Sequence, residues 1–170
     1  MRLFIAICFD DNMLNSLVEI QDDLIRSGGR GNYTPRENLH MTLAFIGEYD
    51  DPEQIEEVMK NVTLRSFSVK LSGYQPFKDM FFANLEENEN LRDYVKRLRK
   101  ALLDEDIPFD RKKFLPHVTL VRRAECTKDK ALLPEFQESE PVRVNGISLM
   151  KSERGKHGMV YTEIGYVRAF

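Results

Sequence analysis

Residues 40–43 of this chain read HMTL, and residues 117–120 repeat the pattern as HVTL. The chain has only three histidines, so two of the three open the same tetrad. Both tetrads lie in short apolar stretches, residues 39–46 and 114–121, whose length and composition are typical of β-strands. The sequence therefore predicts two strands that each carry one imidazole and one hydroxyl.

The spacing within each tetrad decides which side chains share a face. Side chains two residues apart on a strand point the same way and lie about 6.5–7 Å apart. His40 and Thr42 therefore share one face, and His117 and Thr119 share another. The alternate residues are expected to point into the core, among them Met41, Leu43, Phe45, Val118 and Leu120.

Helices and further strands are predicted around the two tetrads. Apolar residues recur at helical spacing from Leu14 to Ile25 and from residue 88 to 103, and Asp51-Pro52 is a good helix start. Strands are expected at residues 3–9, 67–71, 80–85, 142–150 and 159–164, and a weak helix near residues 128–133. The segment that contains Tyr33, Pro35 and Arg36 is expected to be a polar loop.

The two halves of the chain follow a similar order of elements. Each half runs from a helix through a tetrad strand and a short helix to two more strands. This order predicts a degenerate internal duplication within a single domain of residues 1–170. If an approximate two-fold relates the halves, both tetrads would face one cleft.

Bulk properties exclude several classes of protein. The 170 residues are 42% hydrophobic and 31% charged, which is typical of one globular domain and not of a disordered chain. The net charge of −3 argues against a protein that coats long nucleic acid, but leaves room for a local phosphate site.

The apolar run at residues 3–9 is too short for a signal peptide, and no run approaches membrane-spanning length. With Cys8 and Cys126 alone and no CxxC motif, a cytoplasmic setting is expected.

Paired His-Thr faces suit acid–base chemistry at phosphorus. Histidine is the side chain best able to give or take a proton near neutral pH. One imidazole can accept a proton from attacking water while the other protonates the leaving oxygen. Threonine hydroxyls can donate to the non-bridging oxygens.

Other roles for the histidines carry less weight. A single histidine on a strand is usually structural, but a matched pair reverses that expectation. A zinc site is disfavoured, because no third histidine or cysteine pair falls at ligand spacing and neither tetrad contains a carboxylate. His157 has no tetrad around it and is expected to lie in a surface loop.

Basic residues flank the second tetrad and favour an anionic ligand. Arg122 could grip a phosphate through two hydrogen bonds. Strict alternation, however, would point Arg122 away from the face of His117, since it lies five residues further on. Only a strand end, a strong twist or a β-bulge would bring it round.

The chain resembles a known family, the 2H phosphoesterases, and specifically the RNA 2′,3′-cyclic phosphodiesterases once called 2′-5′ RNA ligases. The resemblance covers essentially the whole chain, including Ser152 and Tyr161 in its closing segment. It is carried by RLFIAI at residues 2–7, ENLHMTLAFIG at residues 37–47 and FLPHVTLVR at residues 114–122. Many relatives have Trp where this chain has Tyr33, which puts the contacts of the entrance loop in doubt.

The resemblance implies a bilobal α+β fold, with two pseudo-two-fold-related antiparallel sheets facing a central cleft and helices on the outside. It also implies hydrolysis of RNA or nucleotide 2′,3′-cyclic phosphate ends to 2′-phosphates, with no metal or other cofactor. By matching position, His40 would be the proton donor and His117 the proton acceptor. Thr42, Thr119 and Arg122 would bind phosphate oxygens.

Two alternatives to this hydrolase stay open. One is 2′-5′ RNA ligation on tRNA half-molecules, which the same acid–base pair could catalyse in reverse. The other is a non-catalytic module that binds RNA ends. The expected partners are RNA ends or small nucleotides with a cyclic phosphate, the chain is expected to be a monomer, and no membrane is involved.

Overall fold

The computed structural model describes residues 1–125, 136 and 139–170. In this part of the chain it contains three α-helices, two four-stranded antiparallel sheets and one short strand pair, so the predicted α+β class is confirmed. The weak helix expected near residues 128–133 lies outside the described residues. The internal duplication stays a prediction.

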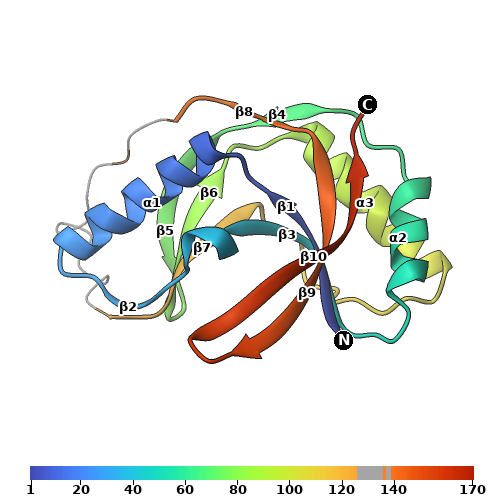
Figure 1. Ribbon diagram of the computed structural model, residues 1–170. Coiled ribbons are helices and arrows are strands. Elements are labelled where there is room, and N and C mark those ends of the chain that lie inside the picture. Colours follow the sequence, from blue (N-terminus) through green and yellow to red (C-terminus); the bar gives the residue numbers. More distant parts are fainter. Residues whose placement is uncertain (126–135, 137–138) are drawn as a thin grey trace.

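Each sheet carries one of the two tetrad strands (Figure 1). The first sheet has the strand order β10-β9-β1-β3, and the second has the order β2-β7-β6-β5. Their bounds are β1 Arg2–Cys8, β3 His40–Glu48, β9 Gly146–Gly155 and β10 Gly158–Arg168 in the first sheet, and β2 Arg30–Tyr33, β5 Leu71–Phe77, β6 Met80–Leu85 and β7 His117–Glu125 in the second. The strands β4 (Phe67–Val69) and β8 (Val142–Val144) pair with each other.

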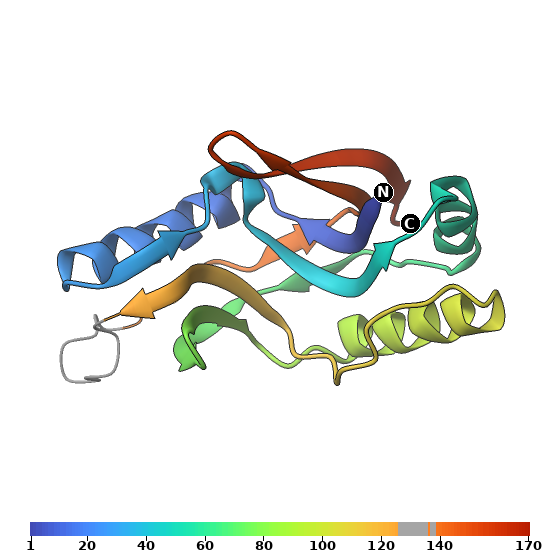
Figure 2. The same cartoon turned by 90° about the horizontal axis from the view of Figure 1, so that it is seen from below.

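The tetrad strands β3 and β7 belong to different sheets but lie next to one another. Figure 2 shows the cyan β3 of the first sheet beside the orange β7 of the second. The residues that open these strands, His40 and His117, are therefore brought toward a common region.

Local sequence explains where the helices α1 (Asp11–Arg26), α2 (Pro52–Asn61) and α3 (Glu89–Asp104) begin. Asp10, Asp51 and Asn88 each accept a hydrogen bond from the backbone N–H three residues on. Such an N-cap contributes about 1 kcal/mol to stability.

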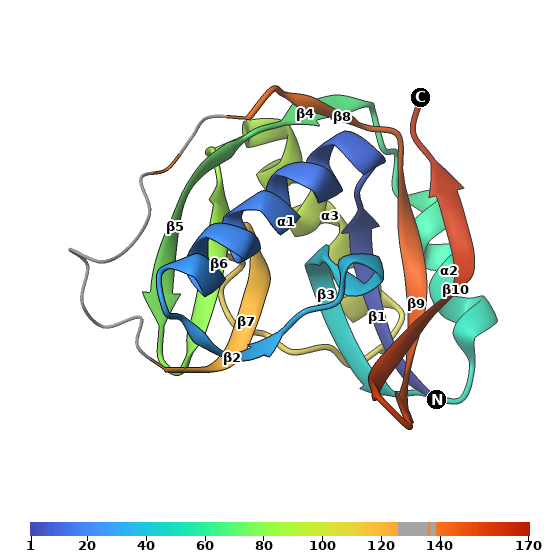
Figure 3. The same ribbon diagram turned by 60° about the vertical axis from the view of Figure 1, so that its left-hand side comes forward.

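The two long helices pack on the tetrad strand of the other half of the chain. Helix α1 precedes β3 in sequence but contacts β7, and α3 precedes β7 but contacts β3. Figure 3 shows α1 beside the second sheet, and α2 beside β10. Because each long helix packs on the tetrad strand of the other half, one apolar core of buried residues spans both sheets.

Two features of the observed fold differ from the sequence-based expectations. The segment expected to be a polar loop forms strand β2, which pairs with β7 from Arg30 to Tyr33, and then a short 3₁₀ helix at Arg36–Asn38. The single strands expected at residues 67–71 and 142–150 are each divided in two.

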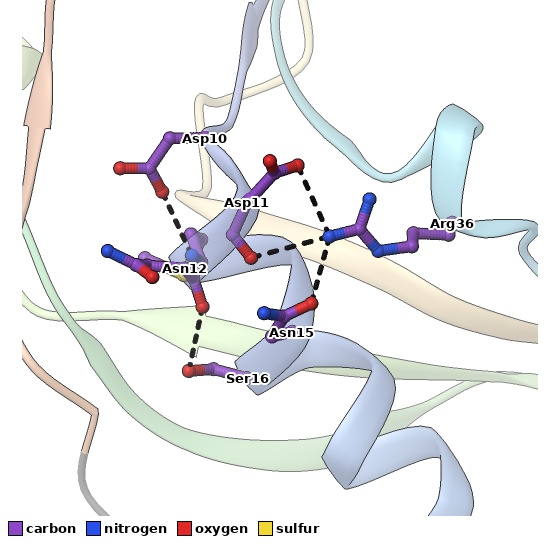
Figure 4. Close-up of polar contacts among 7 residues, drawn as sticks. Asp10, Asp11, Asn12, Asn15, Ser16 and Arg36 are labelled. Carbon is purple, nitrogen blue, oxygen red and sulfur yellow. Dashed lines mark hydrogen bonds and ion pairs between the residues drawn. The ribbon is translucent and has the colours of Figure 1, made fainter.

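The 3₁₀ helix before His40 is tied to the start of α1 by polar contacts (Figure 4). Arg36 donates from Nη2 to Asn15 Oδ1 at 2.9 Å and to Asp11 Oδ1 at 3.3 Å. These contacts are exposed, so their worth in stability is small. They connect α1 to the segment that leads into β3.

Candidate active site

A cavity of about 130 Å³ lies where the two tetrad strands meet. All five residues singled out in the sequence line it. Three further residues, which the sequence did not single out as site residues, complete the lining. The full set is Thr34, Asn38, His40, Thr42, His117, Thr119, Arg122 and Tyr161.

Both tetrad strands contain a β-bulge at the same place, directly after the threonine. In β3, Thr42 pairs with Ala6 and Ala44 pairs with Ile5, so Leu43 is an extra residue. In β7, Thr119 pairs with Phe82 and Val121 pairs with Phe81, so Leu120 is extra. An extra residue shifts the alternation of side chains that follow it by one position.

The bulge in β7 turns Arg122 toward the histidines. Leu120 and Val121 are both buried, and Arg122 is then exposed on the cavity side, where its Nη1 lies 3.8 Å from Met80 Sδ. The β-bulge that Arg122 needs in order to share the face of His117 is therefore present in β7.

The bulge in β3 overturns the expectation that Phe45 points into the core. Leu43 and Ala44 are both buried, and Phe45 follows on the face of His40 and Thr42. There it lines a larger groove and holds the Arg2 guanidinium 4.9 Å from its ring centroid. Phe45 thus occupies the position in β3 that Arg122 occupies in β7.

Polar side chains of α1 and α3 donate hydrogen bonds to the backbone carbonyl groups at the two bulges. Gln21 of α1, which is only 6% exposed, donates from Nε2 to Leu120 O and to Thr34 O, both at 2.9 Å. Arg99 of α3 donates to Leu43 O at 3.0 Å and to Lys112 O at 2.7 Å. Buried backbone carbonyls need such partners. Arg99 serves the bulge in β3, and Gln21 serves the bulge in β7 together with the N–H of Thr34, which lies 3.0 Å from Leu120 O.

Gly31 lets β2 lie against β7 beside Arg122. A Cβ at this position would lie 2.7 Å from Val121 Cγ2 and 2.8 Å from Arg122 O, and its φ is +150°. A larger residue would push the strands apart. Thr34, at the end of the same segment, donates its hydroxyl to Thr119 O at 3.0 Å.

Hydrogen bonds set the same tautomer on both histidines. His40 Nδ1 lies 2.7 Å from Asn38 O, and His117 Nδ1 lies 2.6 Å from Leu115 O. A carbonyl only accepts, so each Nδ1 carries a hydrogen, and each neutral ring has its lone pair on Nε2. His40 Nε2 lies 2.9 Å from Thr42 Oγ1, which can donate to it.

Aromatic neighbours fix both imidazole rings. The His40 ring lies 4.9 Å from the Phe4 ring and 5.3 Å from the Tyr161 ring. The His117 ring stacks on Phe82 at 4.1 Å between centroids. These apolar contacts also remove water from the rings.

The surroundings lower the pKa of both imidazoles. Burial is the largest cause for each and outweighs the backbone hydrogen bond, which raises the pKa. The charge of Arg122 lowers both pKa values further, and the nearby His117 also lowers that of His40. Near neutral pH the free protein therefore holds both rings largely neutral, and a bound anion would favour protonation.

Replacement of Arg122 by methionine is expected to raise the pKa of both His40 and His117, because a nearby positive charge disfavours protonation. An NMR titration of the imidazole Hε1 signals in the free protein measures this. The control is Arg143→Met, which removes an exposed charge on β8, outside the cavity. If both histidine pKa values stayed unchanged in Arg122→Met, the charge of Arg122 would not act on His40 and His117.

The residues that sequence reasoning missed each join two segments. Asn38 is buried, accepts the His40 Nδ1–H on its carbonyl and donates from Nδ2 to Met159 O at 2.9 Å. Tyr161 of β10 packs its ring against Phe4 at 5.0 Å. Both lie in the segments that carry the resemblance, which was the available signal. Tyr33, by contrast, donates to Gly29 O at 3.0 Å and does not line the cavity.

A larger groove, of about 800 Å³, continues from the cavity on the side of His40. It shares His40, Thr42, Arg122 and Tyr161 with the cavity, and it contains Ser152. Basic side chains along it include Arg2, Lys151 and Arg154. His157 stands outside it, exposed at the turn between β9 and β10, as expected of a surface residue.

Two negative findings apply to the described part of the chain. It contains no group of three or more His, Cys, Asp or Glu side chains placed to hold a metal ion. None of its helices is both long and apolar enough to pass through a lipid bilayer.

Comparison with known proteins gives a consistent result. The model of the 2′-5′ RNA ligase superfamily matches residues 11–156. A Thermus thermophilus protein named RNA 2′,3′-cyclic phosphodiesterase is 33% identical over 178 residues, covering 95% of this chain and 87% of its own. A Thermotoga maritima protein of the same name is 31% identical over 132 residues, covering 72% and 70%.

Solved structures agree on the fold. TT0787 of Thermus thermophilus has a TM-score of 0.78 at 26% identity, over 99% of this chain and 97% of its own. LigT of E. coli, without ligand, has a TM-score of 0.82 at 19% identity, over 99% and 96%. The arrangement of the two sheets is thus shared with these proteins.

Proposed function

The chain belongs to the 2′-5′ RNA ligase superfamily of 2H phosphoesterases, and we propose that it hydrolyses the 2′,3′-cyclic phosphate ends of RNA to 2′-phosphomonoesters without a metal ion. One observation carries the proposal. Two imidazoles with the same tautomer, each accompanied by a threonine, line one small cavity together with Arg122. The names of the Thermus and Thermotoga relatives support the substrate.

In the proposed reaction His117 is the base and His40 is the acid, following the family resemblance. His117 Nε2 takes a proton from a water molecule, whose oxygen forms a bond to phosphorus. The bond from phosphorus to the 3′ oxygen breaks, and the protonated His40 Nε2 gives its proton to that oxygen. The product keeps the phosphate on the 2′ oxygen, and a proton passes from His117 to His40 through solvent before the next turnover.

Thr42, Thr119 and Arg122 would hold the non-bridging oxygens during this step. Negative charge grows on these oxygens as water attacks, and donors already fixed in position stabilise it. The bulges matter here because they place Arg122 on the same face as Thr119. Arg122 would act chiefly in binding, since the substrate phosphate carries its charge before the reaction begins.

The two alternatives, an RNA ligase and a non-catalytic binding module, make different demands on the two histidines. In ligation, an RNA hydroxyl would replace water as the nucleophile, which the same pair could activate. Abundant water favours hydrolysis over this route. A non-catalytic binding module would have no need for two histidines with matched tautomers. Action as a monomer in the cytoplasm is part of the same proposal.

The test is to incubate the protein with a nucleoside 2′,3′-cyclic phosphate and identify the product by ³¹P NMR. The 2′-phosphate alone is expected. The 3′-phosphate would mean that the 2′ oxygen leaves instead, and the acid would then be wrongly assigned. No turnover would favour the binding module.

The pH dependence of kcat/KM is expected to be bell-shaped, with its maximum on the acid side of 6.5, the ordinary histidine pKa. Catalysis needs one imidazole protonated and the other neutral. Because burial and Arg122 lower both pKa values in the free protein, the required proton is lost as pH rises toward neutrality. The profile of kcat should lie at higher pH, because bound phosphate raises both pKa values. A maximum of kcat/KM at or above pH 7 would contradict this account.

A further inference from the structure

Three aromatic rings form a continuous stack that runs outward from the cavity. The His117 ring lies on Phe82 at 4.1 Å with an angle of 27° between planes. Phe82 in turn lies on Phe77 at 5.1 Å and 20°. Phe82 is only 4% exposed, but Phe77, at the outer end, is 40% exposed. The last ring of the stack is therefore open to solvent.

Beside this stack lies a second groove, of about 380 Å³, which we call the aromatic groove. It shares Thr42 and His117 with the cavity and Phe45 with the larger groove. Its lining is Thr42, Phe45, Phe77, Phe82, Arg99, Asp110, Lys112, Lys113, Phe114, Leu115 and His117. The larger groove and the aromatic groove thus meet at Thr42 and Phe45, beside the cavity.

The charge around the aromatic groove is mostly positive, although the chain as a whole carries −3. Lys112 and Lys113 line it and are exposed, and the partly buried Arg99 also lines it. Lys78 Nζ lies 5.6 Å from the Phe77 ring centroid. Asp110 is the acidic residue in the lining, 3.9 Å from Lys112 Nζ.

An isolated exposed phenylalanine needs no explanation. Here, however, an exposed ring, a groove next to the catalytic histidine and a set of cations occur together. Aromatic rings that accept nucleobases beside cations that accept phosphates are the usual means of holding single-stranded RNA. The same features fit a peptide poorly, because the groove offers few carboxylate or amide partners.

We propose that the aromatic groove binds the second nucleoside of the RNA end, with its base on Phe77 and its phosphate near Lys112 and Lys113. This rests on the proposed function. If His40 protonates the 3′ oxygen, the terminal ribose lies on the side of His40, in the larger groove. The strand then continues over Phe45 into the aromatic groove. The preferred substrate is therefore an oligonucleotide end and not a mononucleotide.

The test compares a dinucleotide that ends in a 2′,3′-cyclic phosphate with the mononucleoside cyclic phosphate of the same terminal base. For the wild-type protein, kcat/KM for the dinucleotide is expected to be about tenfold higher, the usual worth of one stacked base. Phe77→Leu keeps apolar bulk but loses the ring, and should lower this ratio severalfold, leaving only the part that Lys112 and Lys113 contribute. Phe77→Tyr keeps the ring and should preserve the ratio. Phe170→Leu, which alters a phenylalanine that is 88% exposed at the chain end, is the control.

A wild-type ratio near one would overturn the proposal. So would a Phe77→Leu protein that loses activity on both substrates in the same proportion, since the groove would then hold the terminal base. If neither substrate is turned over, the proposed function has failed instead. The second-nucleoside site is then tested by equilibrium binding of a dinucleotide 2′-phosphate. The affinity should be weaker in Phe77→Leu than in Phe77→Tyr. Equal affinity would refute the second-nucleoside site.

Discussion

His40→Ala and His117→Ala are each expected to lower kcat on a nucleoside 2′,3′-cyclic phosphate by about 10²–10⁴-fold, the usual worth of one proton transfer. Each variant removes the only ring that the proposed reaction provides for one proton. The kcat of the double variant should be only slightly lower than that of the less active single variant, because the two rings act as a unit. Steady-state kinetics measure all three.

The leaving group separates the acid from the base. A phosphodiester that releases p-nitrophenolate needs little protonation of its leaving oxygen. His40→Ala should therefore lose much less activity on this substrate than His117→Ala does. His157→Ala, which removes the exposed histidine of the β9–β10 turn, is the matched control and should keep full activity. Near-native kcat of either cavity variant on the nucleoside 2′,3′-cyclic phosphate would contradict the two-histidine mechanism.

Gln21→Met is expected to lower the free energy of unfolding by about 1–3 kcal/mol, because the Thr34 carbonyl loses the Gln21 donor and the Leu120 carbonyl keeps only the N–H of Thr34. Methionine matches glutamine in size, so packing changes little. Urea denaturation measures the loss, with Asp22→Met, at the next and exposed position of α1, as the control.

The same variant should also affect catalysis at temperatures where it stays folded. Gln21 donates to Leu120 O, directly after Thr119, and to the carbonyl of Thr34, which lines the cavity. If the β7 bulge relaxes, Arg122 turns away, and KM should rise more than kcat falls. A Gln21→Met protein as stable and active as the wild type would show that the bulge does not depend on this side chain.

Most of the fold could be predicted because its signals are local. The helix beginnings followed from Asp51-Pro52 and from the periodicity of apolar residues, and β6 was predicted at its observed bounds, Met80–Leu85. Strand β2 was missed because its four residues, Arg30–Tyr33, contain no apolar alternation. It becomes a strand only by pairing with β7, which is more than 80 residues away.

The bulges illustrate where alternation fails as a guide. Strict alternation placed Phe45 in the core, which is wrong, and would turn Arg122 away unless a bulge intervened, as it does in β7. The sequence does contain a sign of it, since two apolar residues follow each threonine: Leu43-Ala44 and Leu120-Val121. The side chains that stabilise the bulges, Gln21 and Arg99, come from helices exchanged between the two halves, which no local pattern reveals.

The central claim is that His40 and His117 alone supply the proton transfers. The most direct test is to measure turnover of a nucleoside 2′,3′-cyclic phosphate after prolonged treatment with excess chelator, and to identify the product. We expect an unchanged kcat and the 2′-phosphate as the only product. Loss of turnover that a divalent cation restores would contradict the claim.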